Sequence, residues 1–234
     1  MEFKNKTLDD LVSMIEYLDS IIFKSNPVKE IKILNLPKNK KSLVAAYHFY
    51  HDVYIVNNIN KKKTDKEFIV DRRKRYINRI ILETADYQHF TRYTELPLLE
   101  YEFAICVIAA HEIRHRHQLL DMPNLFKYLI DYNSYAEFQP LFSIIEFHLN
   151  ANIEEKLYSP KDFIFEFDAM IVAEIFIIQV YMNKLNGLSF KESLKKSAKV
   201  ITMNSMQLLK LQRKFCFIGK NYFKNFKSTN KDAP

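Results

Sequence analysis

The sequence predicts a single α+β domain, in which a small N-terminal β-sheet is followed by a mostly helical half. Strand-like segments are confined to residues 28–90, where short runs of β-branched and aromatic residues are separated by polar clusters. From residue 97 onward, apolar residues recur at helical spacing. No internal repeat or linker divides the 234 residues, so we expect one domain over residues 1–234.

The N-terminal part is predicted to begin with a helix and to continue as short strands. Leu8–Phe23 carries apolar residues at helical spacing, with Thr7 as a suitable N-cap. Glu30–Leu36 is typical of a short strand. Leu43–Asn57 mixes apolar and aromatic residues with two histidines; this favours a β-hairpin, and a helix is the alternative. Two further segments are strand-like: Phe68–Val70 and Ile77–Leu82.

Two long apolar segments predict helices in the second half. The first begins near Pro97, since a missing N–H is tolerated at a helix start, and it ends at Met122-Pro123. The second covers Lys161–Leu185 and is stopped by Asn186-Gly187. The C-terminal residues 222–234 are expected to be flexible. Other helices are predicted at Asn124–Ile130, Ala136–Leu149 and Ser189–Gln212.

Composition excludes several classes of protein. The net charge of +7 comes mainly from lysine clusters without a recognised nucleic-acid motif, so we expect solvated surfaces and no nucleic-acid partner. Cys106 and Cys216 are too few for a disulfide framework and lie in apolar runs, which predicts reduced, buried thiols in a cytoplasmic protein. The first ten residues contain no apolar core of a signal peptide, and none is expected.

Phe163–Met182 is the segment whose composition comes nearest to a membrane span. It contains Glu166, Asp168 and Glu174, which would be costly in hydrocarbon. We therefore expect a buried core helix there and no membrane span.

Residues 111–115 read His-Glu-Ile-Arg-His and form the motif H-E-x-x-H. Histidines four positions apart on a helix project from the same face, so His111 and His115 can bind one zinc ion. Glu112 is then placed to act as a general base on a zinc-activated water molecule. This pattern predicts a zinc hydrolase, most simply a peptidase.

The residues before the motif support this interpretation. Phe103–Ala110 contains no polar residue, which is typical of a helix buried at the centre of a domain. Such a helix then delivers three histidines, a glutamate and an arginine, which are costly to bury without partners. The alternative is a helix leaving the core, with His111 and His115 as ordinary boundary residues.

A catalytic zinc site needs a third protein ligand. His117 lies about 200° around the helix from His115 and is expected to point away from the metal. Asp121 lies six residues after His115, where metzincin-like sites place their third ligand, but that layout needs a glycine where this chain has Gln118. Glu166 is favoured, because a carboxylate inside an apolar run is costly unless paired or bound to metal. Two other carboxylates stay open: Glu137 and Glu146.

The motif residues resemble the active-site core of the ImmA/IrrE-type gluzincins. The resemblance rests on His111-Glu112-x-x-His115 followed by Glu166-x-Asp168-Ala169-x-x-Val172-Ala173, and it covers roughly residues 100–180. It implies a zincin-like domain with two buried active-site helices, a metal-binding core at about residues 97–186, and Glu166 as the third zinc ligand. One departure is the separation of 51 residues between His115 and Glu166, which is longer than usual in this family.

Several other residues are candidates for supporting roles. Asp168 could accept a hydrogen bond from the far nitrogen of a zinc histidine, or it could be a helix N-terminal acid. Tyr158 or His148 could stabilise an oxyanion. Arg114 and Gln118 match a pattern similar to small phage and bacterial metallopeptidase-like proteins, but the sequence predicts no chemical role for either.

The expected function is that of a zinc-dependent metallopeptidase acting on a protein or peptide. The family resemblance implies a specific intracellular protein as the substrate, such as a phage repressor. The alternative is a non-catalytic module that keeps the zincin fold and binds DNA or a regulator protein.

Overall fold

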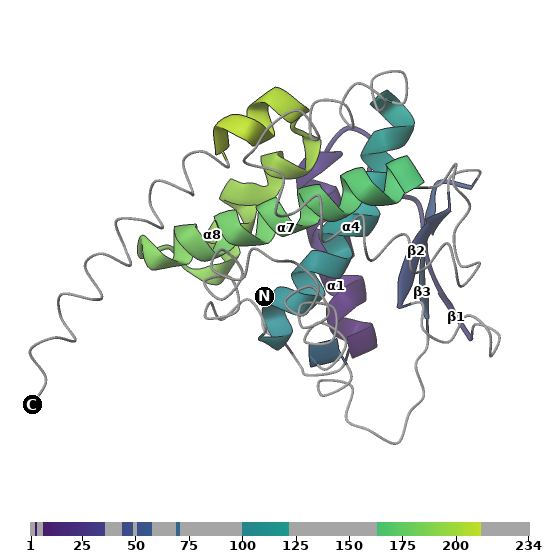
Figure 1. The fold of residues 1–234 in the computed structure, drawn as a ribbon. Coiled ribbons are helices and arrows are strands. Elements are labelled where there is room, and N and C mark those ends of the chain that lie inside the picture. The colour runs from purple at the N-terminus through teal and green to yellow at the C-terminus, as the bar shows by residue number, and fades with distance from the viewer. Residues whose placement is uncertain are drawn as a thin grey trace, which may run out of the picture.

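The structure is a computed structural model that describes residues 3, 7–35, 44–48, 51–57, 69–70, 100–121 and 163–211. Helices dominate it and a small sheet lies at one side, so the predicted α+β class with a mostly helical second half is confirmed (Figure 1). The elements in chain order are α1 (Thr7–Ile22), β1 (Ile31–Leu34), β2 (Ala45–His48), β3 (Val53–Asn57), α4 (Tyr101–Asp121), α7 (Phe163–Leu185), α8 (Phe190–Ser197) and the 3₁₀ helix η5 (Ala198–Thr202). Residues 205–211 are also helical.

The sheet has the strand order β1-β3-β2. Strands β2 and β3 form an antiparallel hairpin, with Tyr47 opposite Tyr54, so the hairpin predicted for Leu43–Asn57 is confirmed over its helical alternative. Asp52 occupies the turn at a φ of 48°, a left-handed conformation that aspartate tolerates better than most residues. Strand β1 lies inside the predicted Glu30–Leu36 segment and pairs parallel with β3.

One strand prediction is wrong. Within Phe68–Val70, the structure describes residues 69 and 70, and both are helical. Ile69 is buried in the core and Val70 packs against it. The segment is therefore apolar and packed as expected, but it is helical and not a strand. A three-residue apolar run is too short for its spacing to separate a strand from a helical turn.

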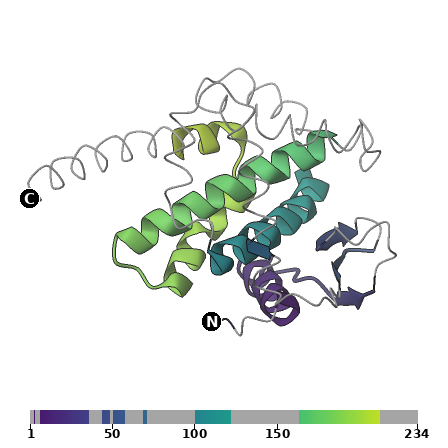
Figure 2. The ribbon, with the colours of Figure 1, turned by 60° about the horizontal axis from the view of Figure 1, so that its bottom comes forward.

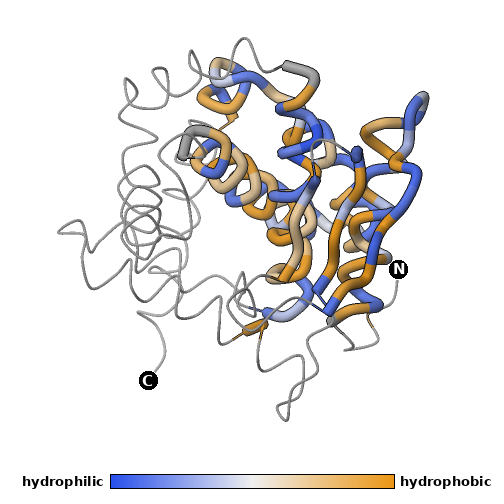
Figure 3. Tube along the Cα trace, turned by 90° about the vertical axis from the view of Figure 1, so that its right-hand side faces the viewer, coloured by the Kyte–Doolittle hydropathy of each residue, from blue (hydrophilic) through white to orange (hydrophobic). Residues whose placement is uncertain are grey.

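Helix α4 lies between α1 and α7 and is the centre of the packing (Figure 2). Its first half buries an apolar run that includes Phe103, Ile105 and Ala109, which confirms the prediction of a buried helix before the motif. Helix α1 begins at Thr7 itself, one residue earlier than expected, and its apolar stripe is fully buried: Leu11, Met14, Ile15 and Leu18. Figure 3 shows the sheet toward the viewer, with hydrophobic and polar residues mixed along its strands and along the helices.

Helix α7 ends where the sequence predicts. Gly187 follows it at a φ of 86°, and its N–H donates to the Lys184 carbonyl at 2.9 Å, which is the left-handed stop that glycine favours. Ser189 then caps α8 in a capping box with Glu192. Leu194 in α8 is buried, so this amphipathic segment returns to the core.

Within the described ranges, no helix combines the length and apolar character needed to cross a membrane. Helix α4 ends at Asp121, directly before the predicted stop at Met122-Pro123. Other predictions lie outside the described residues: the strand at Ile77–Leu82, the helices at Asn124–Ile130 and Ala136–Leu149, the helix start at Pro97, the thiol of Cys216 and the tail 222–234.

Candidate metal centre

The two motif histidines converge on the same face of α4. Because they are one helical turn apart, the Nε2 atoms of His111 and His115 lie 3.0 Å from each other, and the two rings are nearly perpendicular at 88°. His115 is buried, whereas His111 is partly exposed. The imidazoles therefore meet at the rim of the packed core, with one edge of the pair open to solvent.

Glu166 completes the cluster from the first turn of α7. Its carboxylate places Oε2 3.2 Å from Nε2 of His111 and Oε1 3.4 Å from Nε2 of His115. The three ligating atoms lie within 4.8 Å of one another. Glu166 thus lies where the third ligand was expected. Within the described part of the chain, these three residues form the one group of His, Cys, Asp or Glu side chains that could hold a metal ion.

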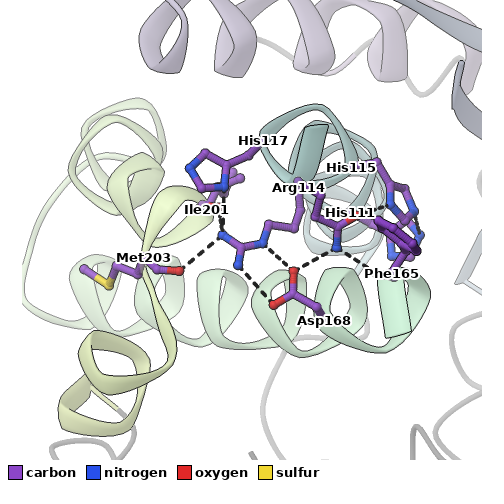
Figure 4. A network of polar contacts seen from close by, with 9 residues as sticks. His111, Arg114, His115, His117, Phe165, Asp168, Ile201 and Met203 are labelled. Carbon is purple, nitrogen blue, oxygen red and sulfur yellow. Dashed lines mark hydrogen bonds and ion pairs between the residues drawn. The ribbon is translucent and has the colours of Figure 1, made fainter. Parts of the chain in front are cut away.

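The structure does not describe the side chains of the other carboxylates that were candidates for the third ligand. Asp121 is the last residue of α4, and the position of its side chain is not described. Glu137 and Glu146 lie outside the described residues, as do the oxyanion candidates His148 and Tyr158. His117 points away from the pair, as predicted: its Nδ1 accepts a hydrogen bond from Arg114 at 3.2 Å, and its ring lies near Ile201 rather than beside His111 and His115 (Figure 4).

The chemistry of the donor set fits a divalent metal ion. Two imidazole nitrogens and a carboxylate oxygen are ligands that zinc accepts. All three atoms present lone pairs toward one another, so the cluster needs either protons or a cation between them. Burial alone would lower the pKa of His115, but the charge and hydrogen bond of Glu166 raise that pKa to about 9. Burial alone would raise the pKa of Glu166, but the two histidines hold it well below its usual range.

These shifts predict how the stability of the metal-free protein depends on pH. The raised pKa of His115 contributes stability that is fully present below about pH 6.5 and is lost as the pH rises through about 9. The lowered pKa of Glu166 contributes stability that is present above its unfolded value of about 4.5 and is lost as the pH falls below it. Urea titrations of the chelated protein should therefore give the highest free energy of unfolding between about pH 4.5 and 6.5. Equal free energies of unfolding at pH 6 and pH 9 would contradict a charged pair of His115 and Glu166.

Glu112 lies next to the cluster but outside it. It is only 6% exposed, and burial raises the pKa of its carboxyl, an effect that Glu166 adds to and the two histidines oppose. The backbone N–H of Tyr47 in β2 donates a hydrogen bond to its carboxylate. Glu112 is thus a buried carboxyl with a raised pKa, held between the motif helix and the edge strand of the sheet.

Gln118 contacts His115 on the side of α4 that faces α7, and Asp168 of α7 contacts Gln118 in turn. Nδ1 of His115 is 2.8 Å from Oε1 of Gln118. Of the two roles left open for Asp168, a direct bond to the far nitrogen of a zinc histidine is not the one seen for His115: Gln118 occupies that place, and Asp168 accepts from Nε2 of Gln118 at 2.8 Å. The Gln118 amide therefore lies between the His115 ring and the Asp168 carboxylate.

Arg114 of α4 binds Asp168 of α7. Its Nε and Nη2 donate to the two carboxylate oxygens at 2.6 and 3.0 Å, and its Nη1 donates to the carbonyl of Ile201 at 2.7 Å. Arg114 is fully buried. No role for Arg114 or Gln118 was predicted from the sequence, but their positions carry a signal: residues 111, 114, 115 and 118 share one helix face, which is the face toward α7.

Arg116 makes a second buried network on the side of the sheet. It donates to both carboxylate oxygens of Asp52 at 2.7 and 2.9 Å and to Oδ1 of Asp19 at 2.9 Å. The hydroxyl of Tyr54 donates to Asp19, and that of Tyr47 donates to Asp52. This network joins α1, the hairpin and the motif helix, and so fixes β2 beside Glu112. This network was not predicted from the sequence, because Asp19 and Asp52 are 97 and 64 positions from Arg116.

Comparison of the chain with family models, curated proteins and solved structures found no match in any of the three. The resemblance to ImmA/IrrE-type gluzincins therefore rests on the motif residues alone. What the structure adds is independent of any relative: His111, His115 and Glu166 are brought together from two helices, with Glu112 beside them.

Proposed function

We propose that the protein is a zinc-dependent metallopeptidase with a zincin-like domain of the gluzincin type. His111, His115 and Glu166 would hold the zinc ion, and Glu112 would act as the general base. The observation that carries the proposal is the convergence of three ligating atoms within 4.8 Å while a second acid, the buried Glu112, stays outside the group. A purely structural zinc site would have no use for that acid.

The residues around the site have distinct tasks in peptide hydrolysis. When bound, zinc would supply Lewis acidity, which favours ionisation of water and polarises a carbonyl group. Glu112 would accept the proton of the attacking water and pass it to the leaving amine. Its raised pKa suits this exchange, because the carboxylate must hold the proton for part of the cycle. The Tyr47 N–H would keep the carboxylate oriented during both transfers.

The substrate class that fits this chemistry is a protein or peptide. The family resemblance favours a specific intracellular protein, such as a phage repressor, and this part of the proposal rests on analogy. The positive charge gives no comparable support to a nucleic-acid substrate, because it comes with no recognised nucleic-acid motif.

Metal analysis tests the proposal directly. Purified protein should contain close to one zinc ion per chain, and His115→Ala should reduce that content to background, because two ligands cannot hold zinc as three do. His117→Ala is the matched control: it removes a histidine two positions along the same helix whose ring lies away from the cluster, and should keep one zinc per chain. Elemental analysis after gel filtration measures both.

The same samples should separate catalysis from metal binding. Wild-type and His117→Ala protein should cleave members of a peptide library, and a chelator should stop the cleavage. Cleavage that persists in fully metal-free protein would contradict the metallopeptidase. Zinc content without cleavage of any peptide or protein substrate would instead favour the non-catalytic binding module.

A further inference from the structure

The Gln118 side chain is buried between the motif helix and the first turn of α7. It is 2% exposed and contacts three polar groups: Nδ1 of His115, the carbonyl of Phe165 and the Asp168 carboxylate, each at 2.8 Å. A buried amide is costly unless its donors and acceptor are satisfied. Here all the groups within reach belong to the surroundings of the candidate metal centre.

The contacts determine which way the Gln118 amide faces. The Phe165 carbonyl and the Asp168 carboxylate are both acceptors, so the amide NH₂ group must face them. The opposite orientation would direct the amide oxygen at two other oxygens and leave two donors against His115. Oε1 must therefore face Nδ1 of His115.

The amide orientation in turn determines the hydrogen on the His115 ring. Oε1 of Gln118 only accepts, so Nδ1 of His115 must carry a hydrogen. A neutral imidazole has one N–H, which leaves Nε2 with its lone pair. That lone pair is directed toward His111 and Glu166, where a metal ion would lie. The Nδ1–H tautomer is the one that can bind a metal through Nε2.

Arg114 and Asp168 hold this arrangement in place. Asp168 is 1% exposed and accepts hydrogen bonds from Nε and Nη2 of the fully buried Arg114. Phe165 and Asp168 also flank Glu166 on the first turn of α7. One glutamine side chain therefore contacts the ring of His115 and the backbone turn that carries Glu166.

We propose that Gln118 is a positioning residue of the metal centre, which fixes the Nδ1–H tautomer of His115 and the separation between that ring and Glu166. The inference rests on the proposed zinc site and assigns to this side chain the orienting role that outer contacts have in zinc proteins. Gln118 is not one of the three clustered ligands and contacts His115 through Nδ1, so it acts through His115.

Three variants test this role through zinc affinity, measured against a competing chelator. Gln118→Met keeps the length of the side chain and removes its polar groups, and should weaken zinc binding by about 10–100-fold. Gln118→Glu keeps an oxygen opposite Nδ1 and can share a proton with Asp168, and should bind zinc more tightly than Gln118→Met. Asn183→Leu is the matched control, because it removes another buried amide, which lies near the far end of α7 and donates to Ser197 of α8. This variant should leave the zinc affinity unchanged.

A spectroscopic measurement distinguishes positioning from general loss of structure. The absorption bands of the Co²⁺-substituted protein report ligand geometry, and they should change in Gln118→Met but not in Asn183→Leu. If Gln118→Met does not fold, Gln118→Asn replaces it, because its amide is one methylene too short to span the same groups, and it should show the same loss.

The outcomes separate this inference from the proposed function. Unchanged zinc affinity and an unchanged cobalt spectrum in Gln118→Met, or equal losses in the Met and Glu variants, would overturn the role of Gln118 while leaving the zinc site intact. A wild-type protein that binds no zinc would instead overturn the site itself.

Discussion

Glu112→Gln is expected to lower peptide hydrolysis by about 10²–10⁴-fold, the loss typical of a removed general base. Glutamine has nearly the same shape as glutamate but cannot accept the proton of the attacking water. Glu112 is not one of the three clustered ligands, so zinc content and thermal stability should stay near those of the wild-type protein. Single-turnover cleavage of a peptide selected from the library measures the effect.

Glu102→Gln provides the control, because it makes the same chemical change in the first turn of the same helix, away from the cluster. It should keep wild-type cleavage and zinc content. If Glu112→Gln retained full biological activity with zinc bound, the protein would act by binding and the enzyme assignment would be wrong. If Glu112→Gln lost its zinc, Glu112 would be a ligand, and the division of roles between it and Glu166 would need revision.

The parts of the fold that sequence patterns predicted well are those determined locally. Helix α7 was predicted within two residues at its start and to the residue at its end, because a long apolar run is followed by Asn186-Gly187. Helix α4 ends directly before Pro123 for a similar reason. The hairpin followed from the composition of Leu43–Asn57. In each case, the determining residues lie next to one another in the chain.

The parts that sequence patterns did not predict depend on contacts between distant segments. The parallel pairing of β1 with β3 joins residues on either side of β2, and nothing within β1 specifies its neighbour. Glu166 was favoured as the third ligand, and its carboxylate lies beside both histidines. For Asp168 the sequence left two roles open, because helical spacing gives the face of a residue but not how far apart two helices pack.

The two arginines of the motif helix illustrate the same limit. Arg114 and Arg116 are about 200° apart around α4, so they must face different neighbours. The structure shows that Arg114 pairs with α7 through Asp168, whereas Arg116 pairs with Asp19 of α1 and with Asp52 of the hairpin turn. Their spacing implies different directions, but only the folded arrangement identifies the acids. The motif helix is consequently fixed on both sides by buried ion pairs.

The pair of Arg114 and Asp168 predicts the largest effect on stability. Arg114→Met should lower the free energy of unfolding of the metal-free protein by about 3–5 kcal/mol, because it leaves the Asp168 carboxylate buried without its cation. That loss is a large fraction of the stability of an ordinary domain. Urea unfolding followed by circular dichroism measures it, and the metal-free form keeps any change in zinc affinity out of the result.

The double variant Arg114→Met with Asp168→Leu determines how much of that loss is uncompensated charge. Leucine has the branched shape of aspartate, and a buried ion pair can be replaced by apolar residues at little cost. The double variant should therefore be more stable than Arg114→Met alone. Gln118 keeps the Phe165 carbonyl as a partner in that background, so the tether to α7 is only partly lost. If the single variant lost less than about 1 kcal/mol, Asp168 would be protonated or solvated rather than paired, and the buried network that supports the metal centre would not be an ionic one.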